Sequence, residues 1–317
     1  MTDELRQSFS RVRAEVAKAV VGQDGAVTGL IVALLVGGHV LLEGVPGVAK
    51  TLLVRTLSRC LHLDTNRVQF TPDLMPGDVT GSLVYDARAG DFEFRAGPVF
   101  TNILLADEIN RTPPKTQSAL LEAMEERQVT VDGQTHPLPE PFLVAATQNP
   151  IEYEGTYTLP EAQLDRFLLK LTLDIPGRDH ELDILARSAA GFNPRDLAAA
   201  GVTPVLDAAQ LACAQQAVAA VGASADVLAY IVDLARSTRR SPSVGLGVSP
   251  RGTTALLAAA KAWAWLTDSD GVTPDHVQAM LLPVWRHRIQ LRPEAELEGV
   301  APDAILRGIL QQVQVPI

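Results

Sequence analysis

The feature that most constrains this chain is a glycine-rich turn between an apolar run and a helix-forming run. The apolar run, His39–Glu43, reads as a short buried strand, and the residues from Leu52 onward have helical periodicity. The turn itself reads Gly44-Val45-Pro46-Gly47-Val48-Ala49-Lys50-Thr51. Glycines at a strand-to-helix turn let backbone N–H groups face an anion at the N-terminus of the helix. The segment therefore predicts a phosphate-binding loop at the edge of a sheet.

Two side chains of this loop have chemistry suited to a nucleotide. Lys50 would reach the β- and γ-phosphates, and Thr51 would place its hydroxyl on Mg²⁺. The strict pattern has glycine directly before the lysine, where this chain has Ala49. We expect its methyl group to be accommodated only if Ala49 has a negative φ and its Cβ points away from the phosphates. A glycine-rich turn without a ligand is the alternative.

A second feature decides between these two interpretations. The apolar residues Ile103–Leu105 run through Ala106 into the adjacent acids Asp107 and Glu108. A buried strand that ends in two carboxylates is costly unless the carboxylates have partners. Asp107 is suited to hold Mg²⁺ through water, and Glu108 is suited to orient and polarise an attacking water. Following a Lys-Thr loop at this spacing, the pair predicts a site that hydrolyses ATP with Mg²⁺.

The first half of the chain alternates short apolar runs with helical stretches, which predicts an α/β core with a mostly parallel sheet. The strand candidates are His39–Glu43, Arg67–Phe70, Asn102–Ala106, Phe142–Thr147 and Phe167–Leu173. In such sheets, ligands bind at the carboxyl ends of the strands. Two hairpins interrupt the core at 82–95 and 128–138, and Asp132-Gly133 suits a type I′ turn in the second. Neither is needed to complete the sheet, which favours a working role over decoration.

The pattern changes after Pro176-Gly177, where we end a nucleotide-binding core of residues 1–177. Residues 178–206 read as a connecting helix and linker. From 207 to 317 the chain is helical, and Ser249-Pro250 and Thr273-Pro274 each place proline after a capping residue. We expect these residues to form a separate, all-helical lid domain.

Charge and composition exclude several classes of protein. The formal net charge is −10, which argues against a general nucleic-acid binder. The two cysteines, Cys60 and Cys213, have no metal-site or disulfide spacing. The uncharged stretch Gly25–Leu42 reads as a buried helix followed by a buried strand, because two glycines break it. With a charged, amphipathic N-terminus, these features predict a soluble cytoplasmic protein without a membrane span.

Seven motifs, in this order, carry a resemblance to a known family. They are Val20-Val21-Gly22-Gln23, GVPGVAKT, LLADEINR, LLEAMEE, ATQNP, LPEAQLDRF and GVSPRG. Over nearly the whole chain they resemble the MoxR family of AAA+ ATPases, a group related to the chelatase ATPase subunits. The resemblance implies a P-loop AAA+ core, its parallel sheet sandwiched by helices, followed by a small helical lid. It matches 82–95 to a helix-2 insert and 128–138 to the hairpin before sensor 1, and the family also carries alanine at the position of Ala49.

The resemblance further assigns residues to the nucleotide site. Asn149 is similar to the sensor 1 residue, which hydrogen-bonds the γ-phosphate or the attacking water. Val21 and Gly22 would line the adenine pocket, although a purely structural role for them stays open. The remaining cofactor-binding residues are Gly44, Val45, Pro46, Gly47, Val48, Ala49, Lys50, Thr51, Leu52 and Asp107, of which Thr51 and Asp107 would also hold the metal.

Two arginines complete the expected catalytic set. Arg251 lies in the first turn of a predicted lid helix, where a cation needs an anionic partner, and a sensor 2 contact with the γ-phosphate fits. Arg166 resembles the arginine finger that reaches the γ-phosphate of a neighbouring subunit. A local surface pair with Asp165 or Glu161 is the alternative for Arg166, and Arg111 is the next candidate for the finger. A finger acting in trans requires a ring, and the family implies a homo-hexamer.

The substrate of the motor stays open at this point. Since core and lid account for the whole chain, we expect a client to be gripped by the inserts, by loops in the ring pore or by a partner protein. MoxR relatives are typically paired with von Willebrand factor A-domain proteins and act like chaperones that mature enzyme complexes or insert metal, so the resemblance implies a protein client. A nucleic-acid translocase is the second hypothesis, because helicase motors share the helix-2 insert. A nucleotide-binding switch without turnover is the third, and the intact catalytic set argues against it.

Overall fold

The apolar runs predicted as strands form one parallel sheet in the computed structural model, which describes residues 2–88, 90–149 and 156–316. Its strands are β1 (Val40–Glu43), β2 (Thr65–Gln69), β5 (Ile103–Asp107), β8 (Leu143–Gln148) and β9 (Leu169–Thr172). They lie in the order β2-β5-β8-β1-β9, and every pairing is parallel. The predicted parallel α/β core is therefore confirmed, and the carboxyl ends of all five strands lie along one edge.

Helices cover both faces of this sheet, because alternate strand residues point to opposite sides. Ile103 and Leu105 of β5 belong to one apolar core, and Leu104 and Ala106 belong to another. The first core is packed by α1, α2 and α3, and the second is packed by α4 and α5. The core helices are α1 (Thr2–Ala17), α2 (Asp24–Val36), α3 (Lys50–Cys60), α4 (Pro76–Thr80), α5 (Pro114–Glu126), α6 (Glu161–Leu164) and α7 (Arg178–Ala189), with a 3₁₀ turn η1 at Ile109–Arg111.

The uncharged stretch after Asp24 forms a buried helix followed by a buried strand, as the sequence predicted. Helix α2 is buried from Ala26 to Leu35, and β1 follows after a turn at Gly37, which has a φ of 69°. No helix in the described part of the chain is long and apolar enough to cross a membrane.

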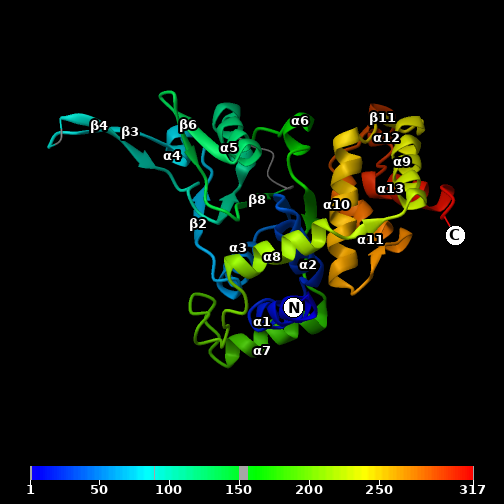
Figure 1. Cartoon of the computed structure of the whole chain (residues 1–317), viewed down its shortest axis with the longest axis horizontal. Coiled ribbons are helices and arrows are strands. Elements are labelled where there is room, and N and C mark those ends of the chain that lie inside the picture. Colours follow the sequence, from blue (N-terminus) through cyan, green and yellow to red (C-terminus); the bar gives the residue numbers. More distant parts are fainter. Residues whose placement is uncertain (1, 89, 150–155, 317) are drawn as a thin grey trace.

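Two antiparallel hairpins interrupt the core. The first pairs β3 (Gly81–Asp86) with β4 (Asp91–Ala96) and projects far from the sheet (Figure 1). Ala89, in its turn, lies outside the described residues. The second pairs β6 (Gln128–Val131) with β7 (Gln134–Pro137), and Asp132 and Gly133 between them both have positive φ, as a type I′ turn requires. Both hairpins leave the five-stranded sheet unaltered.

The C-terminal part of the chain is helical, with two very short strand pairs. Its elements are α8 (Ala208–Ala219), α9 (Ala225–Arg240), α10 (Pro250–Leu266), α11 (Pro274–Trp285), α12 (Pro293–Leu297) and α13 (Pro302–Gln312), with β10 (Gly222–Ala223) paired to β12 (Gly271–Val272) and β11 (Val244–Leu246) to β13 (Gln290–Leu291). Ser249 caps α10, since its hydroxyl accepts a hydrogen bond from the N–H of Gly252 at 3.2 Å. Helix α8 lies along α2 of the core, while α9 to α13 gather at one end of the molecule (Figure 1). A continuous apolar core joins the two parts.

Candidate nucleotide-binding and catalytic site

The glycine-rich loop connects the carboxyl end of β1 to the N-terminus of α3. A Cβ at Gly44 would lie 2.6 Å from the carbonyl oxygen of Leu173, so only glycine fits there. Gly47 has a φ of 90°, which glycine adopts without strain. The Nζ of Lys50 donates to the Gly44 carbonyl at 2.7 Å. The loop thus surrounds the N-terminus of α3, whose first N–H groups have no helical partners and can bind phosphate.

The structure corrects the expectation for Ala49. Its φ is +66° and its ψ is 22°, so it is left-handed, not negative in φ as expected from its side chain. Ala49 is the N-cap of α3, where the chain must turn sharply from loop to helix. A left-handed alanine costs about 1–2 kcal/mol because its Cβ crowds the following carbonyl oxygen. The loop geometry therefore overrides the local preference of this residue.

Asp107 is the centre of a polar cluster at the carboxyl edge of the sheet. It ends β5 and is only 6% exposed. Its Oδ1 accepts a hydrogen bond from the Thr147 hydroxyl at 2.9 Å, and its Oδ2 lies 3.5 Å from the Thr51 hydroxyl. Arg67 of β2 donates from Nε to the same Oδ2 at 2.7 Å. Four elements (α3, β2, β5 and β8) therefore converge on one carboxylate.

This donor set fits a magnesium ion that is shared with phosphates. A hydroxyl and a carboxylate beside a helix N-terminus are hard oxygen ligands, and Mg²⁺ in such sites takes its other ligands from phosphate and water. Among the described residues, no group of three or more His, Cys, Asp or Glu side chains could hold a metal alone. Arg67 neutralises Asp107 here, and its side chain is 55% exposed, so it can move aside for a cation.

Glu108 lies beside this cluster in a strained, left-handed conformation with a φ of 58°. Its backbone N–H donates to the Thr147 hydroxyl at 2.9 Å. Its Oε2 accepts hydrogen bonds from Gln69 Nε2 at 2.6 Å and from Arg111 Nη1 at 2.9 Å. A carboxylate held by two donors is a poor acceptor for a water proton, so these contacts must loosen before Glu108 can polarise water.

Two of these partners were missed from the sequence. Gln69 is the last residue of β2, and Thr147 is next to last in β8. Each is a polar residue at the carboxyl end of a strand, which is the signal that could have found both. Asn149 directly follows β8 and is 4% exposed, so the structure places it at the same edge.

A cavity of about 700 Å³ opens beside the loop. Loop residues 45–49, Leu52 and Val21 line it on one side, and Ile184 and Leu185 of α7 line it on the other. Its largely apolar wall suits a purine base. Gly22 lies next to it with a φ of 73°, and a Cβ there would lie 3.1 Å from the His180 ring. The α7 residues were missed because the sequence pattern ended the core before α7, and such a helix carries no local signal for a base pocket.

The structure places Arg166 and Arg251 far from this cavity. Both line a second cleft of about 440 Å³, together with residues 37–39, which precede β1. The phosphate-binding loop follows the other end of β1, about 13 Å away for four strand residues. In the described chain, no residue after 207 lines the loop cavity. Arg111 differs from both, because it contacts Glu108 of its own site.

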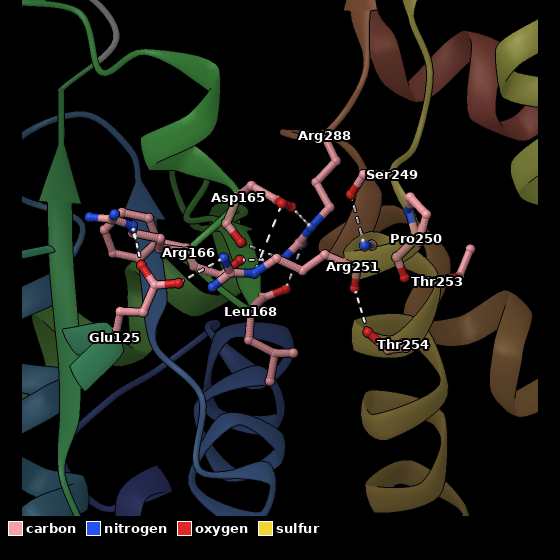
Figure 2. A network of polar contacts seen from close by, with 12 residues as sticks. Glu125, Asp165, Arg166, Leu168, Ser249, Pro250, Arg251, Thr253, Thr254 and Arg288 are labelled. Atoms are coloured by element: carbon pink, nitrogen blue, oxygen red, sulfur yellow. Dashed lines mark hydrogen bonds and ion pairs between the residues drawn. The ribbon is translucent and has the colours of Figure 1, made fainter. Parts of the chain in front are cut away.

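Figure 2 shows what holds the two arginines. Arg166 Nε lies 2.9 Å from Glu125 Oε2, and Arg251 Nη1 lies 3.2 Å from Glu125 Oε1. Arg288, from the loop after α11, binds Asp165 Oδ1 through Nε at 2.7 Å. The local pair of Arg166 with Asp165 or Glu161, the alternative considered from the sequence, is replaced by a contact with Glu125.

Comparisons with known proteins agree with this geometry. A family model described as "ATPase family associated with various cellular activities (AAA)" matches residues 39–169, and one described as "AAA lid domain" matches residues 236–309. The uncharacterised protein YeaC of Bacillus subtilis is 48% identical over 99% of this chain and 97% of its own. The chaperone MoxR1 of Mycobacterium tuberculosis is 41% identical over 98% of this chain and 82% of its own.

A solved structure is similar over the same length. The crystal structure of a protein from Cytophaga hutchinsonii, assigned as an ATPase, has a TM-score of 0.91 and 40% identity. The match covers 100% of this chain and 97% of that one.

Proposed function

This chain belongs to the MoxR family of AAA+ ATPases and hydrolyses ATP, and from that premise we propose that it works as a closed ring that remodels protein clients. One observation carries the ring: Arg166 and Arg251 lie at the opposite edge of the sheet from the phosphate-binding loop. Neither can reach the nucleotide of its own subunit across β1. In a head-to-tail ring, the same two arginines face the nucleotide of the neighbour. Six subunits is the number that the family resemblance favours.

Within one subunit, we assign the roles as follows. Lys50 binds the β- and γ-phosphates, and the N–H groups of the loop and of α3 surround them. Thr51 and Asp107 would hold Mg²⁺, which when bound would neutralise charge on the phosphates. Glu108 leaves Gln69 and Arg111 and then orients the attacking water, while Asn149 holds the water or the γ-phosphate.

The neighbouring subunit supplies the missing positive charge. Charge develops on the γ-phosphoryl oxygens in the transition state, and a guanidinium placed there stabilises it. We assign that role to Arg166 as the finger and to Arg251 as the lid sensor. Arg111 is the weaker candidate, because it contacts Glu108, which belongs to the nucleotide site of its own subunit.

For the client, the β3–β4 hairpin supports a protein over a nucleic acid. Tyr85 and Phe92 are 56% and 63% exposed, and their rings pack edge to face 5.4 Å apart. The hairpin also carries Asp86, Asp91 and Glu93 against Arg88 and Arg95, so it has no net positive charge for phosphates. We propose that it grips polypeptide in the cytoplasm, with a von Willebrand factor A-domain partner selecting the client. Maturation of enzyme complexes, including metal insertion, is the finer activity that we propose.

A mixing experiment tests the ring. Arg166→Ala should turn over at least about a thousandfold more slowly, since its neighbour's site lacks a finger. Glu108→Gln should bind ATP normally and hydrolyse it at least about a hundredfold more slowly. Where an Arg166→Ala site faces the finger of a Glu108→Gln subunit, every catalytic group is present, so mixing the two inactive proteins should restore activity.

The controls are each variant mixed with wild type, and a dilution series, because rescue requires assembly. If mixed rings form and stay as inactive as their parts, Arg166 does not act in trans, and Arg111 becomes the candidate to test.

A further inference from the structure

One carboxylate in the second cleft contacts both of the arginines to which we assign roles at the neighbour's nucleotide. Glu125 lies near the end of α5 and shares its two oxygens between them, Oε2 to Arg166 and Oε1 to Arg251 (Figure 2). Arg166 comes from the segment between α6 and β9, and Arg251 comes from the first turn of α10. Glu125 therefore bridges the core and the lid at the face that we assign to the neighbour.

The other charged groups of this cleft have partners of their own. Arg127 donates to the carbonyl oxygens of Gly37 and Phe142, and the Arg288 guanidinium binds Asp165 and the carbonyl of Phe167. Asp165 lies 3.9 Å from Arg251, against 2.7 Å from Arg288. Glu125 is thus the anion that mainly neutralises the two functional arginines.

Two guanidinium groups repel each other unless an anion lies between them. A phosphate has three acceptor oxygens and more charge than a carboxylate, so it is the stronger ligand for a pair of arginines. The three side chains are 37%, 29% and 49% exposed for Glu125, Arg166 and Arg251, so an incoming group can reach them. The arrangement is that of an anion site already filled by an internal ligand.

We propose that Glu125 is a positioning residue for these two arginines. Its carboxylate keeps Arg166 and Arg251 together in the place that the neighbour's γ-phosphate takes, and it yields that place when ATP binds next door. The inference rests on the proposed ring and adds that Glu125 and the neighbour's γ-phosphate compete for the same two arginines. ATP must displace Glu125 to reach them, whereas ADP has no γ-phosphate with which to do so.

Glu125→Gln tests this competition, since it keeps the length of the side chain and removes its charge. In assembled rings, the KM for ATP should fall by about two- to thirtyfold, the range given by two partly exposed ion pairs. The dissociation constant for ADP and the kcat should stay within about twofold, because both arginines remain available. A merely structural role would shift both nucleotides together.

Two further variants sharpen the result. Glu126→Gln makes the same charge change one residue along, at an exposed position of the same helix, and should leave the KM for ATP unchanged. Glu125→Asp keeps the charge on a shorter stem and should restore most of the wild-type KM. In an Arg166→Ala background the effect of Glu125→Gln should shrink, because one of the two released arginines is gone.

An unchanged or raised KM for ATP in Glu125→Gln, an equal shift for ADP, or an equal response of Glu126→Gln would each overturn the proposal. The mixing experiment runs beside it on the same preparations. Rescue in the mixture without a KM shift in Glu125→Gln leaves the ring standing and removes this inference alone. No rescue in mixed rings removes the trans role of Arg166 and, with it, this inference.

Discussion

The contact between Arg288 and the segment that carries Arg166 predicts how much free energy of unfolding is lost when Arg288 is replaced. The side chain of Arg288 is 3% exposed, and its Nε binds Asp165 Oδ1 at 2.7 Å. Its Nη2 donates to the Phe167 carbonyl at 2.7 Å and its Nη1 donates to the Leu168 carbonyl at 3.0 Å. Burial lowers the pKa of the Arg288 guanidinium and Asp165 opposes that shift, but arginine stays charged in either case.

Arg288→Met keeps much of the apolar stem and removes the charge. Removing one partner of a buried ion pair costs about 3–5 kcal/mol, because the other partner stays buried without it. Asp165 is 24% exposed and retains Arg251 at 3.9 Å. We therefore expect the lower end of that range, about 3 kcal/mol of the free energy of unfolding.

Urea unfolding followed by intrinsic fluorescence measures this cost where it arises. All three tryptophans, Trp263, Trp265 and Trp285, lie in the lid helices α10 and α11, and Trp285 is close in sequence to Arg288. Arg307→Met is the matched control, since Arg307 is 64% exposed and 3.9 Å from Asp303, and it should cost less than about 0.5 kcal/mol. If Arg288→Met cost no more than this control, the reasoning from burial and hydrogen bonding would be refuted.

Two further predictions concern the loop and the core. Ala49→Gly should stabilise the nucleotide-free protein by about 1 kcal/mol, because removing the strain of a left-handed alanine outweighs the extra conformational entropy that glycine gives the unfolded chain. Urea titration measures this difference, and a destabilised variant would contradict the φ of +66°. Burial, aided by Arg127, lowers the pKa of His39 to about 3 from 6.5. The neutral ring is therefore favoured in the fold, so its contribution is complete above pH 6.5 and is lost as the pH falls toward 3, by about 1.4 kcal/mol per pH unit. Between pH 7 and pH 5.5, the urea midpoint of unfolding should fall less in His39→Gln than in the wild type. An equal fall in both proteins would mean that His39 is not the group responsible.

Much of the fold followed from short-range patterns in the sequence. Four of the five strands could be predicted because each contains an apolar run that ends in glycine or polar residues, and because buried parallel strands tolerate little else, whereas β2 is a mostly polar edge strand. The phosphate-binding loop and Asp107 could be predicted for the same reason, since function there requires particular residues at fixed places along a strand. The type I′ turn at Asp132-Gly133 could also be predicted, because it depends only on these two neighbouring residues adopting a positive φ.

The partners across the site could not be predicted, because they depend on how separate elements pack. Arg67 and Gln69 read as ordinary residues of an edge strand, yet they bind Asp107 and Glu108 once β2 lies beside β5. The position of Arg251 depends on how the lid is oriented on the core, which a capped helix in the sequence does not reveal. The prediction of a negative φ for Ala49 was wrong, because it considered the preference of alanine and not the sharp turn that the loop imposes at this position.

The charges of the site, taken together, indicate why an isolated subunit should be idle. Asp107 is neutralised by Arg67 and Glu108 is held by Arg111, so the groups for magnesium and for water are occupied within the subunit. At the opposite edge of the sheet, Glu125 contacts the two arginines that we assign to a neighbour's site. In the proposed ring, ATP with Mg²⁺ would replace the first set of contacts, but only an adjoining subunit would replace the last one. Hydrolysis should therefore depend on protein concentration more steeply than ADP binding does, because ADP has no γ-phosphate for the neighbour's arginines, whereas turnover uses two subunits.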